Sequence, residues 1–352
     1  MQRCGSPLGW AGVCHQEDGV IFETGEHIDL RGGYHQSCDL RKSFGGVPIG
    51  VIGLLRYAMN ERPLWDQGCI DDEIHWALDY YLKTVQPNGC VYNTLNAPLG
   101  WEGRVFFASG APASAQWNVL SILLLGARIF ADDPCHSDRL LDAAQRIWDY
   151  MTRPDRSYEP YHHPSVLPRG MDAEFFYHAS FRDSTSDLCG RLAAAAAFYR
   201  LTGAAKWRNE IEKTANDLCS CFVGDHLEDN IAAGCLRLQK DDLQLMECTV
   251  SYGWTAPGIQ ALFDAIDVMP EAASAGKWRA MAGLIAEQRA MLARKDPWRR
   301  VGSFISRESW MLPSGHPALG YKPTVLGDAF SAAKPAGFVS DSQGRQSQCY
   351  YK

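Results

Sequence analysis

Two kinds of predicted helix alternate along this chain. One kind is nearly all apolar around its circumference and covers residues 47–59, 117–130, 188–199 and 257–266. The other carries a single apolar stripe at the 3.6-residue period and covers residues 72–86, 138–151, 206–222 and 277–292. A helix that is apolar all round must be covered on every side, whereas a striped helix can face water. The alternation therefore predicts an inner ring of buried helices wrapped by an outer ring.

The spacing of the helix pairs indicates a closed ring rather than a linear array. The pairs recur after roughly 70 residues, a much longer period than that of linear helical repeats. We therefore predict an all-α, (α/α)6-type toroid whose long loops gather at one end and form a cleft. Four pairs are visible where six would close the ring, and residues 295–352 are irregular in pattern. The toroid is thus expected either to be incomplete at its C-terminal end or to contain poorly patterned late helices.

The toroid is predicted to be a single domain over residues 1–352, with residues 1–45 as an N-terminal loop segment. Local signals mark several helix ends. Ser137 and Asp138, and the run from Ser184 to Asp187, are of the types that cap a helix N-terminus. Gly203 is a typical residue to follow the end of a helix.

Charge and composition exclude several classes of function. The net charge of −7 argues against nucleic acid as a partner, because phosphate binding requires a basic surface. No apolar stretch reaches the ~18 residues of a membrane span. The first residues lack the apolar core of a secretory signal, which favours the cytoplasm but leaves localisation open. The 12 cysteines are scattered without a CxxC pair, as in a protein with reduced thiols.

One segment carries a family resemblance. Residues 26–42 read EHIDLRGGYHQSCDLRK, and an apolar helix, the helix DDEIHWALDYYLK and the turn NGCVY follow. Residues 199–203 read YRLTG. This order resembles the start of glycoside hydrolase family 9, the six-hairpin glycosidase fold of many endoglucanases. Members carry Asp-x-Ser-Gly-Gly-Trp-x-Asp-Ala-Gly-Asp, an apolar helix, an acidic helix ending in Leu-Lys and a Gly-Val-Tyr turn. The resemblance is specific over residues 26–93 and generic to about residue 294.

The resemblance implies an inverting glycoside hydrolase that needs no cofactor. The last Asp of the family motif, the general base, corresponds to Asp39, whereas the first corresponds to Gln36. An inverting enzyme also needs a protonated acid about 6.5–9.5 Å from the base, so the two come from different loops. Glu308, near the chain end, is the candidate acid. The alternatives are that Asp39 caps the following helix and that Glu308 is a solvated loop residue.

A carbohydrate is the expected partner, and polar or aromatic residues in the long loops are expected to bind it. The candidates are Tyr34, His35, Gln36, Arg41, Trp101, Tyr161, His162, His163 and Trp254. A metal at His162 and His163, with Asp172 and Glu174, is the alternative for that loop. Because adjacent histidines do not share a helical face, we predict no metal site there.

Two other functions remain open at this point. An unsaturated-uronide hydrolase or polysaccharide lyase on the same toroid would use Tyr34, His35 or His162. Arg31 and Arg41 would then pair with the uronate carboxylate. A sugar-binding relative that lost catalysis with Gln36 is the non-enzymatic alternative. The sequence does not indicate an oligomeric state.

Overall fold

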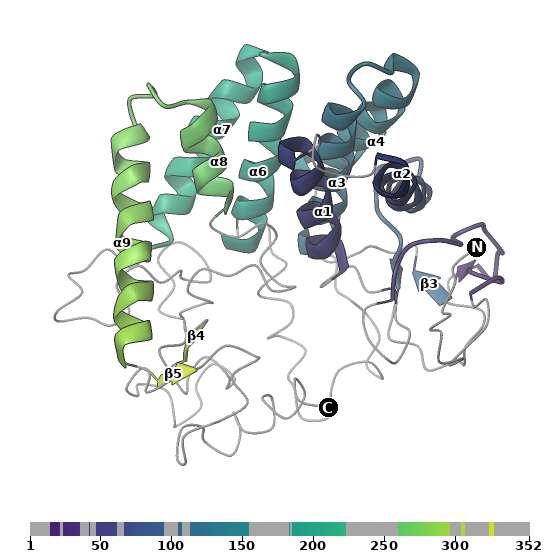
Figure 1. Ribbon diagram of the computed structural model, residues 1–352, viewed down its shortest axis with the longest axis horizontal. Coiled ribbons are helices and arrows are strands. Elements are labelled where there is room, and N and C mark those ends of the chain that lie inside the picture. Colours follow the sequence, from purple (N-terminus) through teal and green to yellow (C-terminus); the bar gives the residue numbers. More distant parts are fainter. Residues whose placement is uncertain are drawn as a thin grey trace. The chain divides into compact units, whose positions relative to one another are not determined.

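The computed structural model describes residues 15–21, 24–35, 42, 47–61, 67–94, 105–107, 113–154, 183, 185–222, 260–295, 304–306 and 324–326. The helices are α1 (Val47–Glu61), α2 (Gln67–Lys83), α3 (Ala113–Ile129), α4 (Pro134–Thr152), α6 (Thr185–Thr202), α7 (Ala205–Ser220), α8 (Gln260–Val268) and α9 (Ala275–Lys295) (Figure 1). Each of the eight predicted helices is present, so the all-α prediction is confirmed. None of the described helices is long and apolar enough to cross a membrane.

The chain divides into two compact units, which are described separately. The N-terminal unit contains residues 1–169, 200–202 and 252–256, and the C-terminal unit contains the remainder. Helices α1 to α4 thus belong to the first unit and nearly all of α6 to α9 to the second. The single domain expected from the sequence stays a prediction.

Helix α3 is the centre of the N-terminal unit and lies against α1, α2 and α4 (Figure 1). Its residues from Ala115 to Leu124 are all buried, as the all-round apolar pattern predicts. The ring of Trp117 contacts that of Trp148 on α4 edge to face at 5.7 Å. Gly126 lets α2 approach closely, because a Cβ atom there would lie 2.5 Å from a methyl carbon of Leu78.

The prediction that all four apolar helices are buried all round is wrong for α1 and for α8, where Phe263 is 45% exposed. Helix α1 shows the reason most clearly. Its buried apolar side chains, Val51, Leu55 and Ala58, form a single stripe, and Tyr57 is 45% exposed. Nothing lies within 4 Å of a Cβ atom built on Gly50 or Gly53. Glycine has no side chain to bury, so these two positions leave one face of the helix uncovered.

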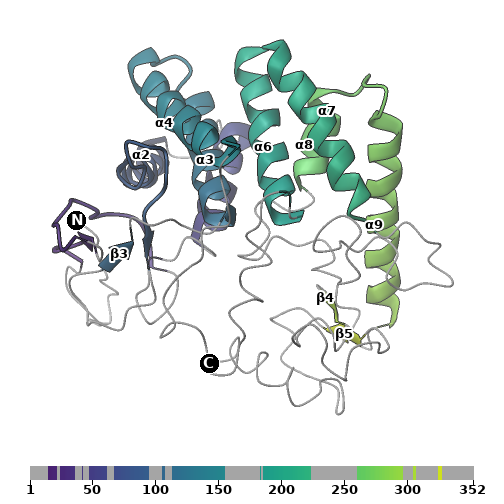
Figure 2. The same ribbon diagram turned by 180° about the vertical axis from the view of Figure 1, so that it is seen from behind.

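The C-terminal unit is built on α6, whose residues from Leu192 to Ala196 are all buried. Phe198 of α6 stacks on Trp207 of α7 with the ring centroids 4.2 Å apart. Helix α7 also lies against α8 and α9 (Figure 2), and the indole of Trp278 on α9 donates to Asn216 at 3.1 Å. The predicted stripe of α7 is confirmed, since Trp207, Ile211, Ala215 and Leu218 are buried.

Two of the predicted helix ends are confirmed and one is wrong. Gly203 has a φ of +63° and donates its N–H to the Tyr199 carbonyl at 2.8 Å, and α6 begins within the predicted capping run. Helix α4, however, starts at Pro134 instead of near Ser137, because the Asp133 side chain caps it and proline suits the first helical position. The hydroxyl of Ser137 instead donates to the Ala127 carbonyl of α3.

A small sheet includes the segment that leads into the motif. Strands β1 (Val20–Ile21), β3 (Val105–Phe107) and β2 (Asn93–Thr94) form one sheet, with β1 parallel and β2 antiparallel to β3. Ile21, Leu30 and Phe106 bury their side chains together. Strands β4 (Phe304–Ser306) and β5 (Thr324–Leu326) pair antiparallel in the region where no helices were predicted.

Candidate active site

The motif segment is anchored first through Asp29. Its carboxylate accepts hydrogen bonds from the Arg31 backbone N–H at 3.1 Å, from Arg31 Nε at 2.9 Å and from Lys83 Nζ at 3.1 Å. The Lys83 ammonium also donates to the Arg31 carbonyl at 3.2 Å. The bonds from Arg31, followed by that from Lys83, hold the pKa of Asp29 well below its usual range. The charged carboxylate thereby ties the segment to the last turn of α2.

Gly32 and Gly33 then lie directly on the ring of Tyr80, a buried residue of α2. Both glycines have positive φ, +115° and +71°. A Cβ atom on Gly33 would lie 2.6 Å from two ring carbons of Tyr80. The indole of Trp76 donates to the Gly33 carbonyl at 3.2 Å. Only glycine combines this backbone conformation with so close an approach.

Tyr34 also binds the motif segment to α2 through a hydrogen bond. Its hydroxyl donates to the Glu73 carbonyl at 3.2 Å. Burial, and secondarily the hydrogen bond to Glu73, raises the pKa of the Tyr34 phenol, so the group stays protonated. The hydroxyl is therefore engaged by the protein, and a sugar contact by Tyr34 would have to come from its ring.

A buried cluster of polar side chains contacts the chain on both sides of residues 36–41. His35 contacts the ring of His15 edge to face, with centroids 4.9 Å apart. Nδ1 of His15 lies 3.3 Å from Asp18, and Lys42 Nζ lies 2.5 Å from the same carboxylate. All three side chains of the His15–Asp18–Lys42 cluster are at most 1% exposed.

The electrostatics of this cluster keep Asp18 ionised. Burial opposes its charge, but the hydrogen bond from His15 and the charge of Lys42 outweigh that effect and lower the pKa of Asp18. Lys42 further donates to the Leu30 carbonyl at 3.4 Å and lies 5.4 Å above the centre of the Tyr80 ring. The cluster thus links the N-terminal segment, the motif and α2.

Most of the predicted site residues lie outside the described residues. These are Gln36, Asp39, Arg41, Trp101, Tyr161, His162, His163, Trp254 and Glu308. The structure places Tyr34 and His35 next to each other between α2 and the buried cluster, and the common cleft expected for the full set stays a prediction. The cluster itself was missed by the sequence analysis, because its members come from two separate segments and no local spacing marks them.

The comparison with family models decides what kind of chain this is. The model described as "Glycosyl hydrolase family 9" matches residues 1–236, about two thirds of the chain. The chain belongs to glycosyl hydrolase family 9. No curated protein sequence matches it significantly.

Solved structures of family 9 proteins share the fold. A metagenome-derived family 9 endoglucanase matches with a TM-score of 0.58 at 17% identity, over 85% of this chain and 53% of its own. AaCel9A in complex with cellobiose-like isofagomine matches with a TM-score of 0.57 at 17% identity and the same coverage. The cellulase Cel9M of C. cellulolyticium, in complex with cellobiose, matches with a TM-score of 0.52 at 16% identity. The match covers 84% of this chain and 62% of the cellulase. The (α/α)6-type fold is thereby confirmed, and this chain spans about half the length of the first two structures.

The family match covers the motif but not the whole expected site. Segment 29–39 lies inside the matched residues, whereas Trp254 and Glu308 lie beyond them. Within the motif this family 9 chain departs from the pattern at Arg31, Tyr34 and Gln36, and at Ser37 and Cys38. In the described part of the chain, no three His, Cys, Asp or Glu residues form a group that could hold a metal ion.

Proposed function

We propose that this chain is a glycoside hydrolase that cuts an oligo- or polysaccharide with inversion, and that Asp39 is its general base. The observation that supports this most is the family 9 match over residues 1–236, which contains the whole motif segment. The described flanks add support, since Lys42 belongs to the buried His15–Asp18–Lys42 cluster and His35 contacts the His15 ring of that cluster. A catalytic base must be held at a fixed position relative to its water, and firmly held flanks serve that requirement.

In the proposed reaction, Asp39 removes a proton from a water molecule whose oxygen attacks the anomeric carbon. The bond from that carbon to the glycosidic oxygen breaks, and Glu308 protonates the departing oxygen. Because the water attacks the face opposite the leaving group, the configuration is inverted. Glu308 is proposed as the acid because it is the only glutamate after Glu287.

Gln36 modifies this chemistry. Its amide can hold the attacking water by hydrogen bonds, but it adds no negative charge that would raise the pKa of Asp39. We therefore expect a slower reaction than that of a site with two aspartates. A change of Gln36→Asp should leave turnover unchanged or raise it.

A neutral glucan is the proposed substrate. Two of the structurally similar proteins were solved with cellobiose or a cellobiose-like isofagomine bound. The remaining proposed sugar contacts are Tyr34, His35, Gln36, Arg41, Trp101, Tyr161, His162, His163 and Trp254. A uronate substrate is less well supported, because the Arg31 guanidinium that would bind its carboxylate already makes two bonds to Asp29, at 2.9 and 3.3 Å.

A panel of substrates separates the proposed hydrolase from the other functions. The purified chain is incubated with neutral glucans and with methylated uronates, and products are followed by reducing-sugar release and by ultraviolet absorbance. Hydrolysis yields reducing ends alone, a lyase also yields a conjugated double bond, and a sugar-binding relative yields neither. The anomer released first, read by proton NMR, reports inversion.

The role of Asp39 is tested with Asp39→Asn, which should lower turnover by about 10² or more, as removal of a general base does. Folding and sugar binding should be nearly unchanged. Asp72→Asn is the matched control, because Asp72 is exposed on α2. If Asp39→Asn turns over substrate at the parent rate, Asp39 is not the base and the proposal fails.

A further inference from the structure

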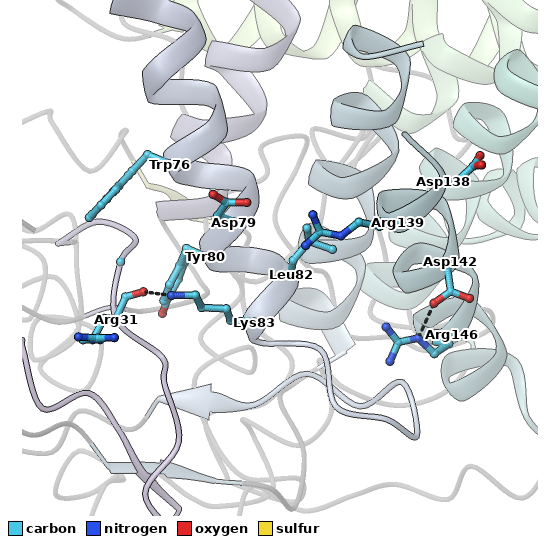
Figure 3. A pocket seen from close by; sticks show the side chains of 11 residues that line it. Arg31, Trp76, Asp79, Tyr80, Leu82, Lys83, Asp138, Arg139, Asp142 and Arg146 are labelled. Atoms are coloured by element: carbon cyan, nitrogen blue, oxygen red, sulfur yellow. Dashed lines mark hydrogen bonds and ion pairs between the residues drawn. The ribbon is translucent and has the colours of Figure 1, made fainter. Parts of the chain in front are cut away.

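A groove of about 710 Å³ lies in the N-terminal unit between α2 and α4 (Figure 3). One wall is the face of α2 that carries Trp76 and Asp79, and the other is the face of α4 that carries Asp138 and Arg139. Arg31 and Gly32 form its rim. The volume lies within the range of about 300–1,000 Å³ that is usual for ligand sites. We call it the α2–α4 groove.

The charged side chains of this groove fall into two sets. In the first set, Lys83 and Arg31 both bind Asp29. Arg146 lies 3.1 Å from Asp142 and donates to the Gln86 carbonyl, also at 3.1 Å. These cations are paired with acidic side chains of the protein. They leave little charge for a ligand.

The second set consists of Asp79, Asp138 and Arg139. All three are exposed, and within the part of the chain that the structure describes they make no hydrogen bond or ion pair. Asp79 projects from α2 and Arg139 from α4 across the groove (Figure 3). The two carboxylates can accept hydrogen bonds from a ligand, and the guanidinium can donate up to five N–H bonds to it.

Trp76 supplies an apolar surface with a fixed orientation. Its ring is half-buried and its indole N–H donates to the Gly33 carbonyl at 3.2 Å. A ring that is already held loses little conformational entropy when a ligand packs on it. An indole face beside carboxylate and guanidinium groups suits a molecule with apolar C–H faces and many hydroxyls.

We propose that the α2–α4 groove is a second carbohydrate-binding site that takes a neutral stretch of an oligo- or polysaccharide. Hydroxyl groups donate to Asp79 and Asp138 and accept from Arg139, and one sugar face packs on Trp76. An anionic sugar is disfavoured, because the available groups carry two negative charges and one positive. The groove is walled by the striped helices α2 and α4 and binds without cutting, so it adds a function beyond the proposed hydrolysis.

The experiment compares Asp79→Ala/Arg139→Ala with the parent by affinity electrophoresis in native gels that contain hydroxyethyl cellulose. The matched control is Arg208→Ala/Glu287→Ala, which removes the same charges from exposed positions on α7 and α9. The dissociation constant of the groove variant should rise by about tenfold, the effect of losing one or two net hydrogen bonds to charged groups. Hydrolysis of a short soluble oligosaccharide should be unchanged in both variants.

Three results would overturn the inference: equal retardation of groove variant and parent, no retardation of the parent, or retardation by polygalacturonate but not by the neutral glucan. Retardation is read separately from hydrolysis. A chain that cuts no glycan but shows groove-dependent retardation therefore contradicts the proposed hydrolase and supports the groove.

Discussion

The ammonium group of Lys42 lies 2.5 Å from Oδ2 of Asp18, and neither side chain is more than 1% exposed. The pair joins the segment before the motif to the residue that follows it. Removing one member would leave the other charge buried without its main partner, which is far more costly than losing the pair as a whole.

We therefore expect Lys42→Met to destabilise the fold by about 3–5 kcal/mol in urea unfolding, and Asp18→Asn/Lys42→Met to recover part of that loss. Lys83→Met is the control. Its pair with Asp29 is 38% and 48% exposed, so its loss should cost less than about 1 kcal/mol. Equal destabilisation by Lys42→Met and Lys83→Met would show that the buried pair contributes no more to stability than the exposed one.

His136 should make stability depend on pH. Burial, and then the charge of His75, lowers the pKa of His136. Protonation is thus harder in the folded than in the unfolded chain, where the pKa is about 6.5. Its contribution to stability is complete above about pH 6.5 and is lost as the pH falls through the folded pKa.

The change His136→Phe tests this, since a phenyl ring can keep the contact with Phe130, now 4.7 Å between centroids. The loss in Tm between about pH 7.5 and pH 5 should be smaller than in the parent. His27→Gln, at an exposed position, is the control and should lose as much Tm between the two pH values as the parent does. If His136→Phe loses as much Tm as the parent, His136 is not the source of the pH dependence.

Gly33→Ala should be more harmful than Gly25→Ala. Both glycines have φ near +70°, so both changes carry the backbone strain, roughly 1–2 kcal/mol. A Cβ on Gly33 also meets the Tyr80 ring at 2.6 Å, whereas one on Gly25 meets nothing within 4 Å. Overpacking should add about 1–3 kcal/mol for Gly33 alone, with loss of any hydrolysis. Equal unfolding free energies of the two variants would show that the backbone at Gly33 can shift away from the Tyr80 ring at little cost.

Two helical glycines should respond to alanine with opposite signs. Gly283→Ala in α9 has free space within 4 Å and should stabilise by about 0.5–1 kcal/mol through helix propensity. Gly126→Ala in α3 would bring a methyl group to 2.5 Å from Leu78, and should destabilise by about 1–3 kcal/mol. Thermal unfolding of the two variants measures this, and a gain in both would mean that α2 and α3 can move apart.

Local patterns in the sequence were sufficient to predict the helices and much of their burial. The stripes Trp207–Ile211–Leu218 and Leu140–Ile147–Trp148 are buried as their 3.6-residue spacing predicts. The reason is that a helix period and an apolar face are properties of a dozen neighbouring residues. The same patterns mispredicted the all-round burial of α1 and α8, where Tyr57 and Phe263 are each 45% exposed.

Tertiary structure decided the relationships between residues far apart in the chain. The link from Asp29 to Lys83 spans 54 positions, and the bond from Trp76 to the Gly33 carbonyl spans 43. Neither has a sequence signature, because the partners become neighbours only when α2 packs beneath the motif. The His15–Asp18–Lys42 cluster likewise exists only because folding buries these three polar side chains together, and burial is what makes their pairing strong. The sequence by itself thus determined the helices and the family motif, and packing determined how that motif is held.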